Sequence, residues 1–464
     1  MKTPADRIPP SPGGKPSRRL VLAAAGAGAG GALLAAGALR SPAAAAATVP
    51  APGPVQLFSD AGLNFSALTA LGAAGYGATE VGEVITAVNT INAAGATYDA
   101  FTDTFLSWGD RLAQQSAQAA DPVTKGELAL RASAYYAQAL FYVLGTAQPD
   151  RELAVYQACR ASWDVFVGTV QPAVQRFSVT CRGVRVPVWL FQPDDSSRPR
   201  PTLLLTNGSD GQNVDLWSYG ASAGLQRGWN VVIYEGPGQG STLFEQKVPF
   251  TSRWEDVVTP IVDYLVRQPF VDRDRIVLTG LSMGGDLAPR AAAFEHRLAA
   301  LVCEPGVTTP WLGFPAKFRA TITADKTATN KTWNTEIVPA LMQPGAAATR
   351  FLLAKRYEPF GAAVLDAVRQ GKLPTDIWTP SQLVQALDIT ATAPRITAPT
   401  LVLNYEDEQF YPGQAETLYS LLKSPKDYVT LTAAEGANLH CSPMAPQRHN
   451  EVIFDWLETT LPRH

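Results

Sequence analysis

A serine lies at the centre of a five-residue pattern that suits nucleophilic catalysis. Residues 280–284 read Gly-Leu-Ser-Met-Gly, after an apolar run at 276–279 and before a helical run at 286–294. Glycines around a serine permit the sharp turn from strand to helix that exposes its hydroxyl group. We therefore predict that Ser282 is a nucleophile. The backbone N–H of Met283, at the start of the expected helix, is then placed to stabilise an oxyanion.

A serine hydroxyl is a weak nucleophile at neutral pH, so it needs a base. The sequence has four histidines. His296 lies on the helical run that leaves the serine and cannot fold back over it, His449 falls in the expected last helix, and His464 ends the sequence. His440 follows the expected strand 428–432 in a loop. Elimination therefore favours His440 as the base.

An acid should orient the base, and we expect it in the loop after the strand that precedes 428–432. That loop offers Glu406, Asp407 and Glu408. We predict Asp407, the fourth residue past the end of the strand, with Glu406 as second choice. Glu304, which follows another expected strand, is a third candidate. The resulting chain order of serine, acid and histidine is one that serine triads adopt.

A second oxyanion donor is expected from the loop 207–211, Asn-Gly-Ser-Asp-Gly, which follows the expected strand 202–206. Gly208 lets the backbone approach closely, and we predict the Ser209 N–H as the donor; an ordinary turn is the alternative. The segment 235–240, Glu-Gly-Pro-Gly-Gln-Gly, lacks the glycine spacing of a dinucleotide-binding loop. We predict a tight loop beside the site.

Short apolar runs separated by helical stretches must position these groups. This alternation predicts a buried, mostly parallel sheet with crossover helices. The expected strands lie at 176–181, 184–191, 202–206, 231–234, 275–279, 300–303, 400–403 and 428–432. A final helix is expected near 447–461.

Two further regions have helical periodicity without strand alternation. We predict a helical N-terminal domain at residues 58–175. It precedes the α/β core, which comprises 176–305 and 396–464. Residues 306–395 interrupt the core and carry several tryptophans and phenylalanines. We expect a helical cap there that selects substrates; a surface insertion that only packs on the core is the alternative.

The first 47 residues have the layout of a signal peptide, and residues 48–57 read as a linker. Arg18 and Arg19 precede an uncharged run at 20–39 that is rich in alanine and glycine, and Ala-x-Ala cleavage sites follow. This pattern predicts twin-arginine export and secretion. The alternative is a membrane anchor, which the weakly apolar run disfavours; no stable anchoring is expected after cleavage.

The composition limits the classes of partner. Of the 464 residues, 46% are hydrophobic and 17% charged, as in an ordinary globular protein, and the net charge of −3 gives no basis for nucleic-acid binding. The four cysteines match no metal-ligand spacing, so we predict buried free thiols. Nothing in the sequence sets the oligomeric state, and a dimer is among the states it allows.

Together these motifs resemble a group of α/β-hydrolases that includes the FrsA-like esterases, the bacterial 2,6-dihydroxypseudooxynicotine hydrolase and fungal hydrolases that shorten polyketide pigment precursors. Some similar chains are labelled dipeptidyl aminopeptidase-like. The resemblance covers the chain from about residue 100 to its end. The matching stretches are 131–142, 207–211, 235–240, 280–285, 289–295, 405–407, 435–437 and 440–441.

The resemblance implies an α/β-hydrolase fold whose helical N-terminal domain helps to roof the active site. It also implies a triad of Ser282, Asp407 and His440 that hydrolyses esters, or carbon–carbon bonds next to ketones, without a metal or organic cofactor. Asn207 stands where many relatives have glycine, and Glu304 begins a segment where an aspartate is common. Both departures lie near the expected site.

We therefore expect a secreted serine hydrolase acting on a small apolar or aromatic carbonyl compound. A dipeptidyl aminopeptidase-like peptidase is an alternative, disfavoured because no propeller-like strand repeat precedes the hydrolase core. A catalytically inactive binding protein on the same scaffold is another alternative. The intact serine, acid and histidine argue against it.

Overall fold

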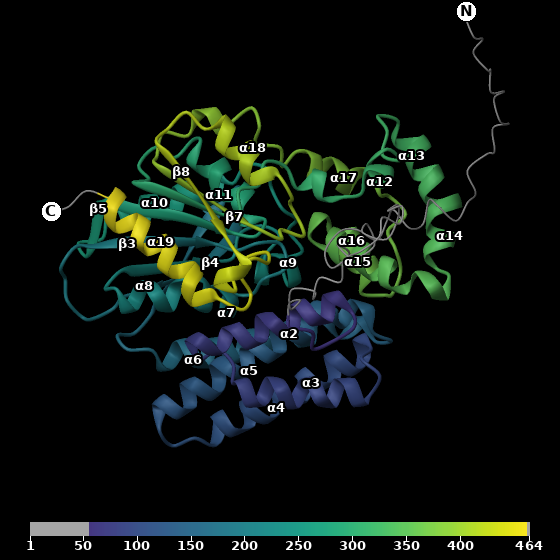
Figure 1. Cartoon of the computed structure of the whole chain (residues 1–464), viewed down its shortest axis with the longest axis horizontal. Helices are drawn as coiled ribbons and strands as arrows, with labels where there is room; N and C mark the ends of the chain where they lie inside the picture. Colours follow the sequence, from purple (N-terminus) through teal and green to yellow (C-terminus); the bar gives the residue numbers. More distant parts are fainter. Residues whose placement is uncertain (1–54, 462–464) are drawn as a thin grey trace, which may run out of the picture.

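The computed structural model describes residues 55–461, so the predicted signal peptide and most of the predicted linker lie outside the described residues. Its centre is one sheet with the strand order β1-β2-β4-β3-β5-β6-β7-β8 (Figure 1). The strands are β1 (Gln175–Cys181), β2 (Val184–Phe191), β3 (Arg200–Thr206), β4 (Asn230–Tyr234), β5 (Val271–Leu281), β6 (Ala300–Glu304), β7 (Thr400–Tyr405) and β8 (Lys426–Leu431). Each expected strand is therefore present, with ends shifted by a few residues.

The sheet is antiparallel at one edge and parallel elsewhere. β1 and β2 form a hairpin, and β2 pairs antiparallel with β4. All pairs from β4 through β3, β5, β6 and β7 to β8 are parallel. Parallel strands end at the same edge of a sheet, so the loops after β3, β5, β7 and β8 come together there.

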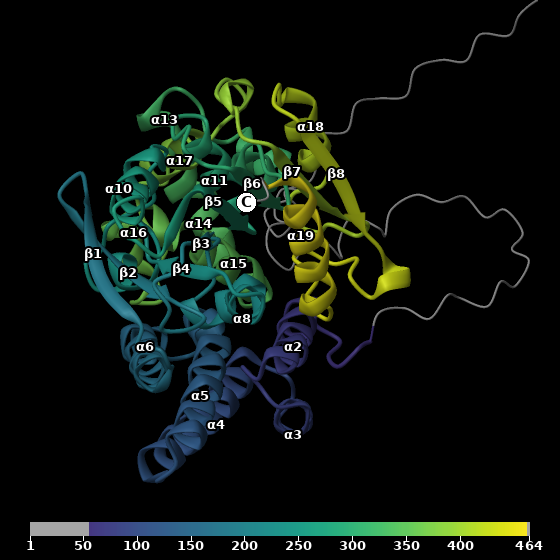
Figure 2. The ribbon, with the colours of Figure 1, turned by 90° about the vertical axis from the view of Figure 1, so that its left-hand side faces the viewer.

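Helices cover both faces of the sheet, as the doubly wound class requires. Along β3, Leu204 packs into one hydrophobic core, whereas Leu203 and Leu205 pack into the other. The helices of the first face are α10 (Glu255–Leu265), α11 (Gly284–Ala292) and α18 (Gln414–Leu421), and those of the second are α8 (Ser222–Gln226) and α19 (Pro446–Thr460) (Figure 2). The predicted α/β class with a mostly parallel sheet is confirmed.

A block of helices precedes the first strand and packs below the sheet in the view of Figure 1. Asp60, Thr97 and Asp121 cap three of these helices by accepting hydrogen bonds from backbone N–H groups of the first turn. Buried aromatic rings such as Phe101 and Tyr135 fill the space between the helices. The helices are α2 (Ala61–Ala73), α3 (Val81–Ala93), α4 (Tyr98–Gln118), α5 (Pro122–Tyr142) and α6 (Glu152–Thr169).

The chain between β6 and β7 contains helices and no strand, and it lies beside the helical block (Figure 1). The ring of Phe351 stacks on Tyr142 with 5.4 Å between centroids, and the guanidinium of Arg369 donates to Glu152 at 2.7 Å. The insertion therefore contacts the N-terminal helices. Its main helices are α12 (Ala316–Arg319), α13 (Lys326–Thr332), α14 (Val338–Leu341), α15 (Ala347–Tyr357), α16 (Ala362–Val368) and α17 (Trp378–Gln385).

Two properties of the described residues bear on the sequence expectations. All four cysteines are buried free thiols, as predicted. Among residues 55–461, no helix combines the length and the apolar character that crossing a membrane demands.

An ion pair with a buried carboxylate joins the helical block to the sheet. Arg160 of α6 donates to both carboxylate oxygens of Glu235, at 3.2 and 3.1 Å. The Glu235 carboxylate also accepts from the Asn213 side chain at 2.9 Å, and from the Ser241 hydroxyl at 2.6 Å. Glu235 is only 4% exposed. The first glutamate of segment 235–240 is thus a structural anchor.

We expect Glu235→Gln to lower the free energy of unfolding by about 2 kcal/mol, because the buried side chain loses its charge-assisted hydrogen bonds and Arg160 keeps only Asp164 as a charged partner. Urea unfolding of the purified protein measures this change. Asp103→Asn is the matched control, since it removes the charge from an exposed partner of Arg151 and should cost under about 1 kcal/mol. Equal losses of unfolding free energy in the two variants would show that the Arg160–Glu235 pair stabilises the protein no more than an exposed pair does.

Candidate active site

Ser282 sits on a tight turn between β5 and α11. Its backbone φ is +57°, and its N–H donates to the carbonyl of Glu304 at 2.7 Å. Glycines surround the turn because there is no room for side chains. A Cβ at Gly280 would overlap the Gly284 carbonyl, and one at Gly285 would overlap the Pro305 carbonyl. The strand, turn and helix that the sequence predicted around the serine are all present.

His440 lies in the loop after β8 and contacts the serine. Its Nε2 is 2.9 Å from the Ser282 Oγ. The backbone N–H of His440 donates to the side chain of Gln409 at 2.9 Å, and the ring packs on Phe410 at 4.6 Å between centroids. The imidazole is therefore held in place from two sides and is buried. Of the three histidines within residues 55–461, His440 is the one that contacts Ser282, as elimination indicated.

The acid that contacts His440 is Glu408, so the prediction of Asp407 is wrong. The two carboxylate oxygens of Glu408 lie 2.8 and 2.9 Å from the His440 Nδ1. Glu408 also accepts hydrogen bonds from the N–H groups of Phe410 and Tyr411, at 2.8 and 3.0 Å. The sequence offered Glu408 in the same loop, but its spacing from the strand did not single it out.

Asp407 faces away from the site because its backbone extends the parallel pairing of the sheet beyond the end of β7. It forms an isolated parallel bridge with Leu439, and its N–H donates to the Asn438 carbonyl at 2.9 Å. Its exposed carboxylate instead accepts from the Asn438 side chain at 2.6 Å. Neighbouring residues in extended chain point to opposite sides. The next residue, Glu408, therefore turns inward, while the second choice, Glu406, is exposed and accepts from the Ala433 N–H.

The surroundings of Glu408 favour its ionised form. Burial acts to raise its pKa, but the neighbouring His440 and the N–H groups of Phe410 and Tyr411 outweigh burial, so that the pKa of Glu408 falls below its ordinary value. A carboxylate that stays charged beside Nδ1 keeps a proton on that nitrogen. The Nε2 is then free to accept a proton from Ser282.

Glu304, the third candidate acid, does not contact His440. Its carboxylate lies 3.4 Å from the Nε2 of His449, whose ring also contacts the hydroxyl of Tyr405 at 3.1 Å. Burial raises the pKa of Glu304 to about 8 and lowers the pKa of His449 to about 3. Both groups are therefore neutral near neutral pH. Glu304 serves the site through its backbone carbonyl, which holds the Ser282 N–H.

The two predicted oxyanion donors lie close together near the serine. Ser209 and Met283 line one small cavity, and neither backbone N–H donates to another described residue. The N–H of Gly208 donates to the Asn207 side chain at 2.8 Å, so in this pair of residues only the Ser209 N–H lacks a partner among residues 55–461. A Cβ at Gly208 would lie 2.7 Å from the Ser282 Cβ, so glycine is needed for this close approach.

The segment 235–240 lies beside the site, as predicted. The Gln239 side chain donates to the carbonyls of Asn207 and Gly208, at 2.7 and 3.1 Å. These bonds fix the backbone of the loop that carries Ser209. Gln239 is itself 4% exposed, so the support is internal and rigid.

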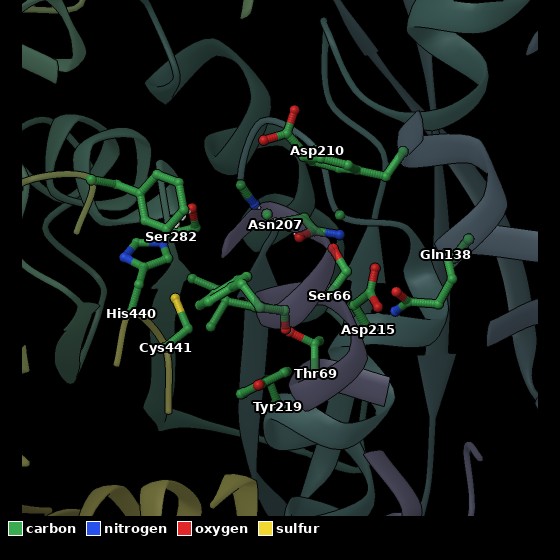
Figure 3. A pocket seen from close by; sticks show the side chains of 18 of the residues that line it. Ser66, Thr69, Gln138, Asn207, Asp210, Asp215, Tyr219, Ser282, His440 and Cys441 are labelled. Carbon is green, nitrogen blue, oxygen red and sulfur yellow. Dashed lines mark hydrogen bonds between the residues drawn. The ribbon is translucent and has the colours of Figure 1, made fainter. Parts of the chain in front are cut away.

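The serine and histidine open into a cavity of about 170 Å³ (Figure 3). Much of its wall comes from the N-terminal helices, through residues of α2 and α5 that sequence patterns gave no reason to assign to a site. The residues that line this cavity include Phe65, Ser66, Gln138, Phe141, Tyr142, Asp215, Tyr219 and Phe410. The roofing role that the resemblance implied for the helical block agrees with this lining.

The insertion between β6 and β7 contributes less to this cavity than expected. Arg356 is its residue in the wall of the main cavity. Phe314 instead lines the small cavity beside Ser209 and Met283, while Trp311 lines a separate surface hollow. No group of three or more His, Cys, Asp or Glu side chains within residues 55–461 is arranged to hold a metal ion.

Two curated proteins are similar in sequence to part of this chain. The chain is 29% identical over 262 residues to the hydrolyase poxO of Penicillium oxalicum, covering 53% of this chain and 61% of that protein. It is 27% identical over 264 residues to the 20-hydroxy-prefusarin hydrolase of Gibberella moniliformis, covering 54% and 62%. The matched region thus spans about three-fifths of the length of these curated relatives.

A solved structure shares the architecture over most of the chain. The 2,6-dihydroxy-pseudo-oxynicotine hydrolase superimposes with a TM-score of 0.61 at 18% identity, covering 84% of this chain and 95% of the other. At this identity the likeness concerns the fold alone. It confirms the predicted α/β-hydrolase fold. The Alpha/beta hydrolase family profile matches residues 203–453, more than half of the sequence. The chain belongs to the alpha/beta hydrolase family.

Proposed function

We propose that this protein is a serine hydrolase that cleaves an ester, or a carbon–carbon bond next to a ketone, in a small apolar or aromatic carbonyl compound. The observation that carries the proposal is the position of His440 between Ser282 and Glu408, with hydrogen-bond distances on both sides. The mostly apolar and aromatic wall around these residues supports the substrate class.

In the first step the Ser282 Oγ attacks the carbonyl carbon while His440 Nε2 takes the hydroxyl proton. The imidazolium that forms is stabilised by Glu408, which remains ionised. The carbonyl oxygen becomes an oxyanion, and the N–H groups of Met283 and Ser209 donate to it. Because both donors lack another partner, they need not break an existing bond.

Collapse of the tetrahedral intermediate then breaks either bond with the same groups. For an ester, the C–O bond breaks and His440 returns its proton to the leaving alkoxide. For a carbon–carbon bond, the attacked ketone becomes the acyl group, and the leaving carbon departs as the enolate of a second carbonyl group that it carries; His440 then protonates this enolate. Both routes leave an acyl group on Ser282, which water removes with His440 again acting as base.

The relatives support a small organic substrate. One of them is named a 20-hydroxy-prefusarin hydrolase, and the superimposable structure is named a 2,6-dihydroxy-pseudo-oxynicotine hydrolase. We infer that the present protein acts on a carbonyl compound of comparable chemical class. Aryl esters and aminoacyl amides compared on purified enzyme test this class, because faster cleavage of the amides would favour a peptidase instead.

We expect Ser282→Ala to abolish turnover and His440→Ala to lower kcat by roughly 10⁴-fold or more. Labelling with a fluorophosphonate probe should disappear in Ser282→Ala, because the nucleophile is gone. Hydrolysis of an aryl ester measures the rates. An unlabelled Ser282 in the folded parent protein would make the serine mechanism untenable.

The two neighbouring acids provide a sharper comparison. Glu408→Gln should lower kcat by about 10³–10⁴-fold, because His440 loses the carboxylate that fixes its tautomer. Asp407→Asn, the matched control one residue away, should change kcat by less than about tenfold, since its partner is Asn438 on the surface. A larger loss from Asp407→Asn would return the acid role to Asp407.

The insertion should influence substrate choice through Phe314. We expect Phe314→Ala to enlarge the small cavity beside Met283 and to change the order of rates for aryl esters of increasing acyl length. Trp311→Ala is the control, because Trp311 does not line either cavity at the serine. Rates are normalised to the number of sites that the fluorophosphonate probe labels. If both variants kept the parent order of rates for these esters, this part of the insertion would not select substrates.

We also propose that the protein is secreted through twin-arginine export, on the basis of its first 47 residues. Replacing Arg18 and Arg19 together with lysine should leave the precursor inside the cell, because that route requires the arginine pair. Immunoblots of cell and medium fractions measure the distribution. Unchanged secretion of the double variant would indicate the general secretory route.

A further inference from the structure

The main cavity has two chemically different ends. Ser282 and His440 form one end, and the side chains of Asp215 and Gln138 lie at the other (Figure 3). Ser66 and Asn207 lie between the two ends, but both side chains already have partners, Tyr142 and the Gln212 carbonyl, and most of the remaining wall is aromatic or aliphatic. A substrate whose carbonyl carbon lies at Ser282 therefore extends toward a carboxylate. The mechanism above makes no use of that carboxylate.

Asp215 has unused hydrogen-bonding capacity. Its Oδ2 accepts from the Gln212 N–H at 2.7 Å, but its Oδ1 has no hydrogen-bond partner among residues 55–461. The side chain of Gln138, on helix α5 in the same cavity wall, also has no hydrogen-bond partner among residues 55–461. Two polar side chains from different parts of the chain thus face a mostly apolar cavity without partners.

The protein holds Asp215 at a fixed distance from the nucleophile. Gly208, which touches Ser282, lies on the short loop that leads from β3 to the helix carrying Asp215. The Asn207 side chain donates to the Gln212 carbonyl at 2.9 Å and braces this loop from within. Gln212 in turn caps α7 (Asn213–Leu216), on which Asp215 lies. The carboxylate is therefore preorganised, which is what a recognition group requires.

The carboxylate lacks full solvation in this position. Burial raises the pKa of Asp215 to about 6, and the single hydrogen bond from Gln212 offsets burial only in part. A donor group on a bound molecule would supply the hydrogen bond that water gives an exposed carboxylate. Ligands without such a donor would leave the Asp215 carboxylate poorly solvated.

We propose that Asp215, assisted by Gln138, binds a hydrogen-bond donor at the end of the substrate remote from the scissile carbonyl. The donor is a hydroxyl group or a protonated amine. The proposal rests on the proposed function, since it takes Ser282 as the point of attack. In this arrangement the cavity wall selects the remote end of the substrate. The residues on the loops that follow the strands carry out the reaction.

The test uses three para-nitrophenyl esters of one shape: phenylpropanoate, para-hydroxyphenylpropanoate and para-(aminomethyl)phenylpropanoate. The parent enzyme should hydrolyse at least one of the two donor-bearing esters with a kcat/KM about tenfold or more above that of the plain ester, as expected for a hydrogen bond to a charged group. The ester that gains more identifies the donor as hydroxyl or amine.

Asp215→Asn should reduce that preference by about tenfold, while its side-chain oxygen can still accept from the Gln212 N–H and keep the loop in place. Asp455→Asn, on the exposed side of α19, is the matched control and should retain the parent ratios. Gln138→Leu supplies a second variant on another helix and should reduce the preference less. Ratios of kcat/KM are independent of the fraction of folded enzyme.

The outcomes separate the two proposals. If the esters are cleaved and Ser282 is labelled, but the parent enzyme prefers neither donor or Asp215→Asn keeps the parent ratio, then the role of Asp215 is wrong and the proposed function stands. If no ester is cleaved and Ser282 resists the fluorophosphonate probe, the proposed function itself fails.

Discussion

The rest of the site depends on the close packing of backbone around Ser282. The serine N–H is held by the Glu304 carbonyl at 2.7 Å, and Gly208 lies against its side chain. These contacts require the ends of β3, β5 and β6 to be neighbours, and the sheet order makes them so. A serine with a positive φ is strained, and such a residue persists only where its surroundings determine it fully. The sheet therefore fixes the position of Ser282, and the loops that it brings together complete the candidate site.

Burial affects the carboxyl groups of the site in different ways. Glu408 receives hydrogen bonds from His440 and two backbone N–H groups, so its charge is compensated and its pKa is lowered. Glu304 has no comparable compensation, and its pKa rises to about 8. Asp215 lies between these cases, with one backbone donor and a pKa of about 6. The number of hydrogen-bond donors that face each carboxylate thus determines how readily it ionises, and this limits the role that it can take.

The architecture separates the reacting groups from the walls of the pocket. The reacting groups lie on loops of the sheet, whereas α2 and α5 supply much of the wall. Ion pairs with buried carboxylates hold these parts together, with Glu235 joined to Arg160 and Glu152 to Arg369. Because the helical block and the insertion share one continuous hydrophobic core with a face of the sheet, the pocket wall is part of the rigid interior.

The sequence by itself predicted the strands, the α/β class, the nucleophile and the base. These features follow from local patterns: apolar runs of strand length, glycines that surround a serine, and one histidine in a suitable loop. It did not predict the acid, because Glu406, Asp407 and Glu408 are consecutive carboxylates and their spacing from β7 does not say which one turns inward. The bridge between Asp407 and Leu439 decides that, and it forms only when β7 and the loop after β8 lie side by side. The same reason applies to Asp215 and Gln138, which are distant in sequence and line one cavity only after α5 packs over the loop from β3. Local residue patterns determine elements and single reactive groups, whereas contacts between distant segments decide which side chains share a site.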